Sequence, residues 1–134
     1  MRAAAKAVVL TMLMSVGSPA MAQILPNRDA VQWQEVGAVG AFRYFIDETS
    51  LARDGDVLTV LMRGSAPPSP DDGVNTIVAR LTLDCQQRLV ALGARDYYRE
   101  VAGFTESSRL EGQLKAPTDP GQALLLDRLC ALRP

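Results

Sequence analysis

The chain has 134 residues, 14 lysines and arginines against 15 acidic residues, a net charge of −1 and no histidine. A slightly acidic chain without a basic cluster lacks the electrostatic footprint of a nucleic-acid-binding protein. The absence of histidine excludes Ser-His and Cys-His nucleophile pairs and the usual zinc and copper ligand sets. No G-x-G-x-x-G or P-loop motif is found either. We therefore expect one small domain with no cofactor, no metal and no nucleic-acid partner.

The first 22 residues have the three parts of a secretory signal peptide. A short positive segment (1–6) is followed by an apolar run (7–16) and by the small residues of an A-x-A cleavage site (18–22). The apolar run is shorter than the roughly 20 residues that span a bilayer. Cleavage after Ala22 would leave Gln23 first, where a lipoprotein needs a cysteine. Loss of Arg2 and Lys6 would lower the basic count from 14 to 12 and the net charge to about −3. We expect a periplasmic or secreted chain without a transmembrane anchor.

Residues 23–32 are expected to be a lead-in segment, and residues 33–134 a single domain that begins near Trp33. Alternating apolar residues predict six strands, at 33–39, 40–47, 56–63, 75–85, 87–98 and, more weakly, around 101–105. The segment 56–63 is apolar on both sides and is expected to be central. A turn is predicted at 52–55. In the fourth strand one face carries Ile77, Ala79, Leu81, Leu83 and Cys85, which directs Cys85 into the core.

The period of the apolar residues changes to that of a helix near the C-terminus. Asp119 suits the N-cap, Pro120 the first helical position and Gln122 the capping-box position. An apolar stripe follows at helical spacing: Leu125, Leu126, Leu129, Cys130 and Leu132. In an oxidising compartment two cysteines favour a structural disulfide over free thiols, so Cys85 and Cys130 would hold this helix on the inner face of the sheet. The predicted fold class is α+β, an antiparallel sheet of about five or six strands packed by a C-terminal helix with one disulfide.

Short framework motifs are spread along almost the whole predicted domain: Trp33, Tyr44-Phe-Ile-Asp47, Ser50-Leu51, Arg53-Asp-Gly55, Asp84-Cys85, and Leu129-Cys130 after Pro117-Thr118. Together they resemble the surface-adhesin protein E family of Gram-negative bacteria. The resemblance implies an antiparallel sheet joined to a C-terminal helix by a disulfide, and a role in adhesion to host matrix and serum proteins. The family's known adhesin is a lipoprotein, whereas Gln23 follows the expected cut here.

From these features we expect an exported, non-enzymatic binding module whose partner is a host or envelope macromolecule. A periplasmic envelope protein of structural role is the alternative. Unpaired strand edges also leave a homodimer open.

Three groups of residues are candidate binding features, and each has a plainer interpretation. Aromatic residues of the predicted strands could form a platform, or could be core and cross-strand pairs. Arginines could form a basic face, or belong to a mixed surface with the interleaved acids Asp84, Asp96 and Glu100. The loop 64–73 could be a recognition tip or a plain connection. The aromatic residues are Trp33, Phe42, Tyr44, Phe45, Tyr97 and Tyr98. The arginines are Arg80, Arg88, Arg95 and Arg99. The loop candidates are Pro67, Pro68, Pro70, Asp71 and Asp72.

A carboxylate-dependent hydrolase is the enzymatic alternative. Asp47 with Asp54, or Asp71 with Asp72, would supply the two carboxyl groups of a glycoside hydrolase. These aspartates lie at predicted turns, where their side chains are expected for backbone reasons. Ser107-Ser108 has no base that the sequence identifies. The sequence therefore predicts no catalytic residue.

Overall fold

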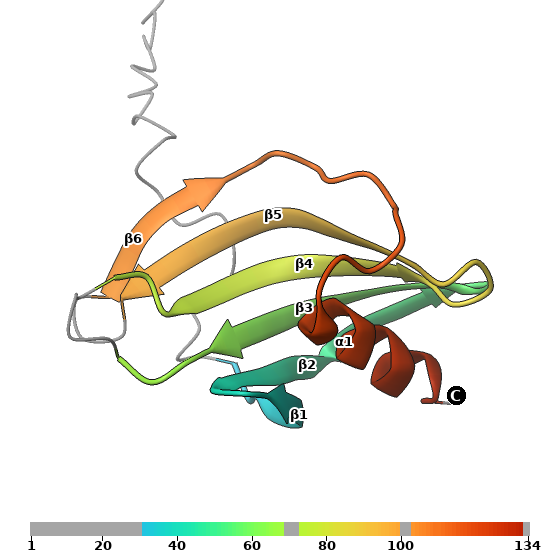
Figure 1. The fold of residues 1–134 in the computed structure, drawn as a ribbon. Coiled ribbons are helices and arrows are strands. Elements are labelled where there is room, and N and C mark those ends of the chain that lie inside the picture. Colours follow the sequence, from blue (N-terminus) through green and yellow to red (C-terminus); the bar gives the residue numbers. More distant parts are fainter. Residues whose placement is uncertain (1–30, 69–72, 100–102, 133–134) are drawn as a thin grey trace, which may run out of the picture.

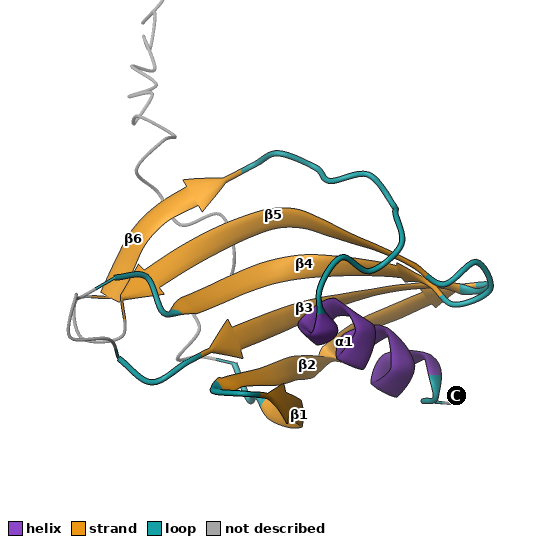
Figure 2. Ribbon diagram, in the orientation of Figure 1, coloured by secondary structure: helices purple, strands orange, loops and turns teal. Residues whose placement is uncertain are grey.

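The computed structural model describes residues 31–68, 73–99 and 103–132. Within these ranges the chain forms one six-stranded antiparallel sheet, in the order β1-β2-β3-β4-β5-β6, with helix α1 across one face (Figures 1 and 2). The predicted α+β class is confirmed. The elements are β1 Gln34–Val39, β2 Phe42–Asp54, β3 Val57–Ser65, β4 Thr76–Asp84, β5 Leu89–Arg99, β6 Gly103–Ser108 and α1 Pro120–Cys130.

The second strand is longer than the sequence predicts. We expected a turn over residues 52–55, but β2 continues to Asp54, and the turn lies at Gly55–Asp56, where Gly55 has a φ of 60°. A glycine adopts this left-handed conformation without the steric cost of a Cβ. Between Asp47 and Ala52 the register with β3 shifts. The Asp47 carboxylate stabilises this bulge by accepting hydrogen bonds from the Thr49 backbone (3.1 Å) and hydroxyl (2.6 Å). After the bulge, β2 pairs with β3 again from Ala52 onward, where the sequence predicts a turn.

The main core lies between the sheet and α1. It contains the residues that alternation assigned to the inner face of β4, including Ala79, Leu81 and Leu83. Cys85 packs at its edge and is bonded to Cys130, with 5.5 Å between their Cα atoms. The disulfide and the inward direction of Cys85 are confirmed. The third strand is central as predicted, since it lies between β2 and β4. Three consecutive residues of β3 are buried, so the strand is covered on both faces of the sheet.

The helix begins as predicted, with one difference in its cap. Asp119 Oδ1 accepts a hydrogen bond from the Gln122 backbone at 2.8 Å. The Gln122 side chain, however, accepts from the Thr118 backbone at 2.9 Å rather than from the N-cap residue itself. Three leucines of the predicted stripe are buried: Leu125, Leu126 and Leu129. Leu132 is 42% exposed because the helix has already ended at Cys130.

The opposite face of the sheet carries a second, smaller cluster. Leu61, Val78 and Tyr98 are buried there, and Val31, Trp33 and Phe104 pack against them. The structured chain therefore includes Val31, inside the segment expected as a lead-in. No helix in the described ranges is long and apolar enough to cross a membrane.

Candidate ligand-binding groove

Helix α1 covers only one end of the sheet face on which it packs (Figure 1). At and beyond its N-terminus the face carries Phe42 and Tyr44 from β2, Ile77 from β4 and Tyr97 from β5. The strand register places these residues on one side, because Tyr97 pairs with Ile77, and Tyr44 pairs with Gly64, which pairs in turn with Ile77. Phe42 is 43% exposed, a large value for an aromatic side chain beside a core.

An apolar hollow runs from this open face under the first turns of α1. It encloses about 480 Å³, its open mouth included. Apart from Asp119 and Gln122 at the helix end, its described lining is hydrophobic: Phe42, Tyr44, Met62, Ile77, Leu81, Leu92 and Leu125. Such a lining, with a few polar groups at one side, is typical of a site for a small apolar group.

Tyr44 connects the sheet to the helix at the mouth of the apolar hollow. Its ring stacks on Phe42, with centroids 6.2 Å apart. Its hydroxyl occupies the space where a Cβ of Gly121 would lie, so glycine allows the close approach. Burial, and secondarily the Asp119 carboxylate, raise the pKa of Tyr44 above its ordinary value of 10.0. The phenol is therefore neutral at physiological pH.

A polar hollow adjoins the apolar one and shares Leu92 and Gln122 with it. It encloses about 720 Å³, open space included, and its described lining is Val90, Ala91, Leu92, Arg95, Gly112, Gln113, Lys115 and Gln122. Two of these residues are cations and two are amides, and no described carboxylate is among them. The polar hollow is thus a candidate anion site.

Hydrogen bonds to the β5 backbone position both cations of the polar hollow. Lys115 forms an antiparallel bridge with Val90, through hydrogen bonds of 2.8 and 3.1 Å. Arg95 donates from Nε to the Gly93 carbonyl at 3.2 Å and from a terminal nitrogen to the Leu92 carbonyl at 3.4 Å. The guanidinium is therefore held beside Leu92, at the boundary between the two hollows.

An outer hollow continues the apolar one toward the end of the sheet at which β2 and β4 begin. It shares Phe42 and Ile77 with the apolar hollow and is completed by Val74, Asn75, Thr76 and Tyr97. The polar, apolar and outer hollows thus follow one another through shared residues. We call the three together the groove.

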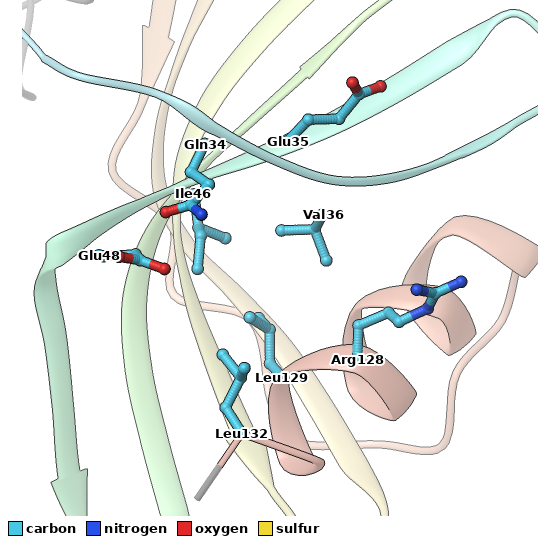
Figure 3. Close-up of a pocket in the computed structure, with 8 residues that line it drawn as sticks. All are labelled: Gln34, Glu35, Val36, Ile46, Glu48, Arg128, Leu129 and Leu132. Carbon is cyan, nitrogen blue, oxygen red and sulfur yellow. The ribbon is translucent and has the colours of Figure 1, made fainter. Parts of the chain in front are cut away.

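A separate cleft lies between β1 and the C-terminal end of α1 (Figure 3). Its lining includes Glu35, Glu48 and Arg128 around Val36 and Leu129. Figure 3 shows Glu35 pointing away from Glu48. Glu35 pairs with Phe45, one position from the Gln34–Ile46 pair, and lies 3.8 Å from Arg43. The two carboxylates thus point in different directions from opposite sides of the cleft.

The first of the two predicted carboxylate pairs, Asp47 with Asp54, is not brought together by the sheet. Asp47 and Asp54 pair with β3 residues four positions apart, about 13 Å along the strand, which exceeds the separation in glycoside hydrolases. Asp71 and Asp72 lie outside the described residues. The Ser107 hydroxyl donates to buried Asp96 at 2.5 Å. No group of three metal-ligating side chains occurs in the part of the chain that the structure describes.

The other candidate features divide between the two faces. Of the aromatic residues, Phe42, Tyr44 and Tyr97 line the groove, while Trp33 and Tyr98 belong to the second cluster. Phe45 lies under the Arg63 guanidinium at 5.4 Å.

The arginines do not form one basic face. Arg88 pairs with Asp127 on the helix, Arg80 and Arg99 are exposed, and Arg95 alone among the four lines the groove. Glu100 lies outside the described ranges. Of the loop candidates, Pro67 and Pro68 are exposed, and Pro70 lies outside the described residues together with Asp71 and Asp72.

Sequence reasoning singled out neither Lys115 nor the side chain of Gln122 as a groove residue. Lys115 lies in the connection between β6 and α1, and Gln122 lies in the first turn of α1. Both residues could have been placed in the groove only if the pairing of that connection with β5 had been predicted. No protein-family model, curated protein or solved structure matches the chain significantly. Functional inference therefore depends on the groove itself and on the framework motifs.

Proposed function

We propose that the chain is an exported, non-enzymatic binding module that recognises a host or envelope macromolecule through the groove face of its sheet. The observation that carries this proposal is the uncovered part of that face, where partly exposed Phe42 lies beside two hollows with largely apolar linings. Exposed apolar surface next to a rigid scaffold is a common property of recognition sites, and aromatic residues dominate their binding energy.

Two features support export. The disulfide between Cys85 and Cys130 is of the structural kind that persists in oxidising compartments. The signal-peptide pattern of residues 1–22 points the same way, and cleavage would release a periplasmic or secreted domain. Disulfide formation in the described part of the chain and the leader pattern outside it are independent observations.

The resemblance to the surface-adhesin protein E family supports adhesion as the kind of binding. The framework motifs of that resemblance lie at structural positions here, since Asp84-Cys85 ends β4 and Leu129-Cys130 ends α1. Exposed Pro67 and Pro68, at the end of β3, provide a second contact region next to the groove. A structural role in the envelope, with a second copy pairing at a strand edge, is the competing assignment.

The test is retention of the oxidised chain beginning at Gln23 on immobilised matrix proteins, serum proteins and envelope fractions at physiological salt. We expect at least one of these to retain the domain, and Phe42→Ala to reduce retention. Leu110→Ala is the matched control, because Leu110 is 77% exposed and lines none of the three hollows. Absence of retention, together with hydrolysis of a glycan or ester, would replace this proposal with the hydrolase. A dimer without other partners would favour the structural role.

A further inference from the structure

We propose that the groove binds a single-chain amphiphile with an anionic head, such as a fatty acid or a lysophospholipid. The hydrocarbon chain would lie in the apolar and outer hollows, and the head would lie beside Arg95 and Lys115. This inference names a ligand for the face assigned above to binding and so rests on that assignment. It is carried by the juxtaposition of an apolar and a cationic hollow.

The lining of the apolar hollow selects for hydrocarbon. Buried Met62, Leu81 and Leu125 form its apolar floor, and two oxygen atoms at its helix end are already engaged. Asp119 Oδ1 accepts from the helix backbone, and Gln122 Oε1 accepts from Thr118. Most polar groups of a sugar or nucleotide placed here would lose hydrogen bonds to water without replacement, because the rest of the lining is hydrophobic. An alkyl chain loses none and removes apolar surface from water.

The outer hollow lets the chain extend beyond the buried part. Phe42 and Ile77 line both hollows, so a chain that passes between them remains in contact with apolar side chains. Val74, which is 44% exposed, and Tyr97 continue this surface toward solvent. The apolar exposure at this end of the sheet is explained if a ligand covers it.

The polar hollow selects for negative charge. Arg95 offers a planar set of donors and Lys115 an ammonium, and Gln113 and Gln122 supply neutral donors around them. Three nearby carboxylates could repel an anionic head. Glu111 contacts Gly93, Asp119 caps the helix, and Glu106 pairs with Tyr97. None of these three carboxylates is among the described lining residues of the polar hollow. An anionic head placed there would therefore lie closer to the two cations than to any of the three carboxylates.

Calorimetric titration of the oxidised chain beginning at Gln23 tests the proposal with ligands kept below their micellar concentrations. Dodecanoate and a lysophosphatidate of equal chain length represent the two sources of the anionic head. Dodecanol and dodecyltrimethylammonium represent the same chain without that charge. We expect one or both anions to bind at least about tenfold more tightly than the alcohol, and the cation to bind most weakly. The tighter anion identifies a carboxylate or a phosphate as the natural head.

Substitutions separate the head from the chain. Two variants remove positive charge from the polar hollow: Lys115→Gln, and the double variant Arg95→Gln, Lys115→Gln. Each should lower the affinity for the anions about tenfold and leave the affinity for dodecanol unchanged. Arg80→Gln is the matched control, since Arg80 is exposed and pairs with Leu61 of the second cluster. Phe42→Ala should lower the affinity for the anions and for the alcohol by the same factor. Lys115 is exposed, so its single variant remains informative even if the Arg95 variant folds poorly.

Methyl NMR locates the bound chain. Dodecanoate should shift the signals of Ile77 and Leu92 and leave those of Val36 and Leu132, in the separate cleft, unchanged. Shifts confined to the separate cleft, equal affinity for all four head groups, or no binding would overturn the inference. Retention of the domain by a macromolecule despite such a result would leave the binding-module proposal standing, so the two failures are distinguishable.

Discussion

The hydroxyl of Tyr44 lies in the space that a side chain at Gly121 would occupy, so the second strand and the first turn of α1 meet without a gap. This contact forms part of the wall of the apolar hollow beside the first turn of α1. It fixes the position of the helix N-terminus on the sheet face that carries the groove.

Replacing Gly121 with alanine should destabilise the domain by about 1–3 kcal/mol, because the new methyl group overlaps the Tyr44 ring and hydroxyl. Urea unfolding would measure the change. Gly73→Ala is the control, since nothing lies within 4 Å of a Cβ built there. Equal stability of the two variants would show that the helix can shift away from Tyr44 at little cost.

Loss of the disulfide should lower stability substantially. The bond joins residues 45 positions apart, and closure of a loop of this length lowers the entropy of the unfolded chain by an amount equivalent to about 4 kcal/mol. The Cys85→Ser, Cys130→Ser double variant should therefore unfold at lower urea concentration than the oxidised chain. Peptide mass spectrometry without reduction should recover the two cysteines bonded, and two free thiols in the exported protein would contradict the structure.

Leu126→Asp should unfold the domain. Leu126 is 1% exposed and packs in the main core, so the variant loses its apolar contacts and buries a charge, a combined cost of about 3 kcal/mol or more. Thermal melting followed by circular dichroism measures this. Leu132→Asp introduces the same charge at a position that is 42% exposed and should melt close to the original chain. An unchanged melting temperature for Leu126→Asp would refute the packing of α1 on the sheet.

Stability should decrease at alkaline pH through Tyr44. Its pKa is raised in the folded state, so the folded protein holds the phenolic proton more tightly than the unfolded chain does. The resulting stabilisation is present in full below the ordinary pKa of 10.0 and is lost as pH rises through the folded-state value. Tyr44→Phe should flatten the decline in urea stability above pH 10. A variant that loses stability just as steeply would assign the decline to other groups.

Most of the sheet could be predicted because its inner face repeats every second residue. In β4 the alternation from Ile77 to Leu83 is uninterrupted, and its bounds were correct to one or two residues. In β2 the repeat is interrupted by a bulge, at which the Thr49 backbone donates a hydrogen bond to the Asp47 carboxylate. Aspartate and threonine form the same kind of bond in turns, so the sequence does not distinguish the bulge from a turn. The helix was found because Asp119, Pro120 and the leucine stripe are local signals.

The groove could not be predicted in the same way. Arg95, Lys115 and Gln122 come together because the connection after β6 pairs with β5, and nothing periodic in the sequence marks that pairing. Another bulge, between Ala79 and Leu81 in the pairing of β4 with β5, changes the alternation of β5. Arg95 therefore faces the helix side of the sheet, although simple alternation from Leu92 places it on the other side.

The order of the strands has a consequence for how the chain acquires its structure. Every strand pairs with its neighbour in sequence, so each hairpin closes a short loop and the sheet can grow step by step. Helix α1 has 11 residues, fewer than the roughly 12–15 at which an isolated helix is even marginally stable, so its stability depends on packing against the sheet. Packing of the helix on the sheet holds Cys130 beside Cys85 in the folded domain. Docking of the helix therefore favours oxidation of this pair, and the bond in turn keeps the end of a short helix attached to the sheet.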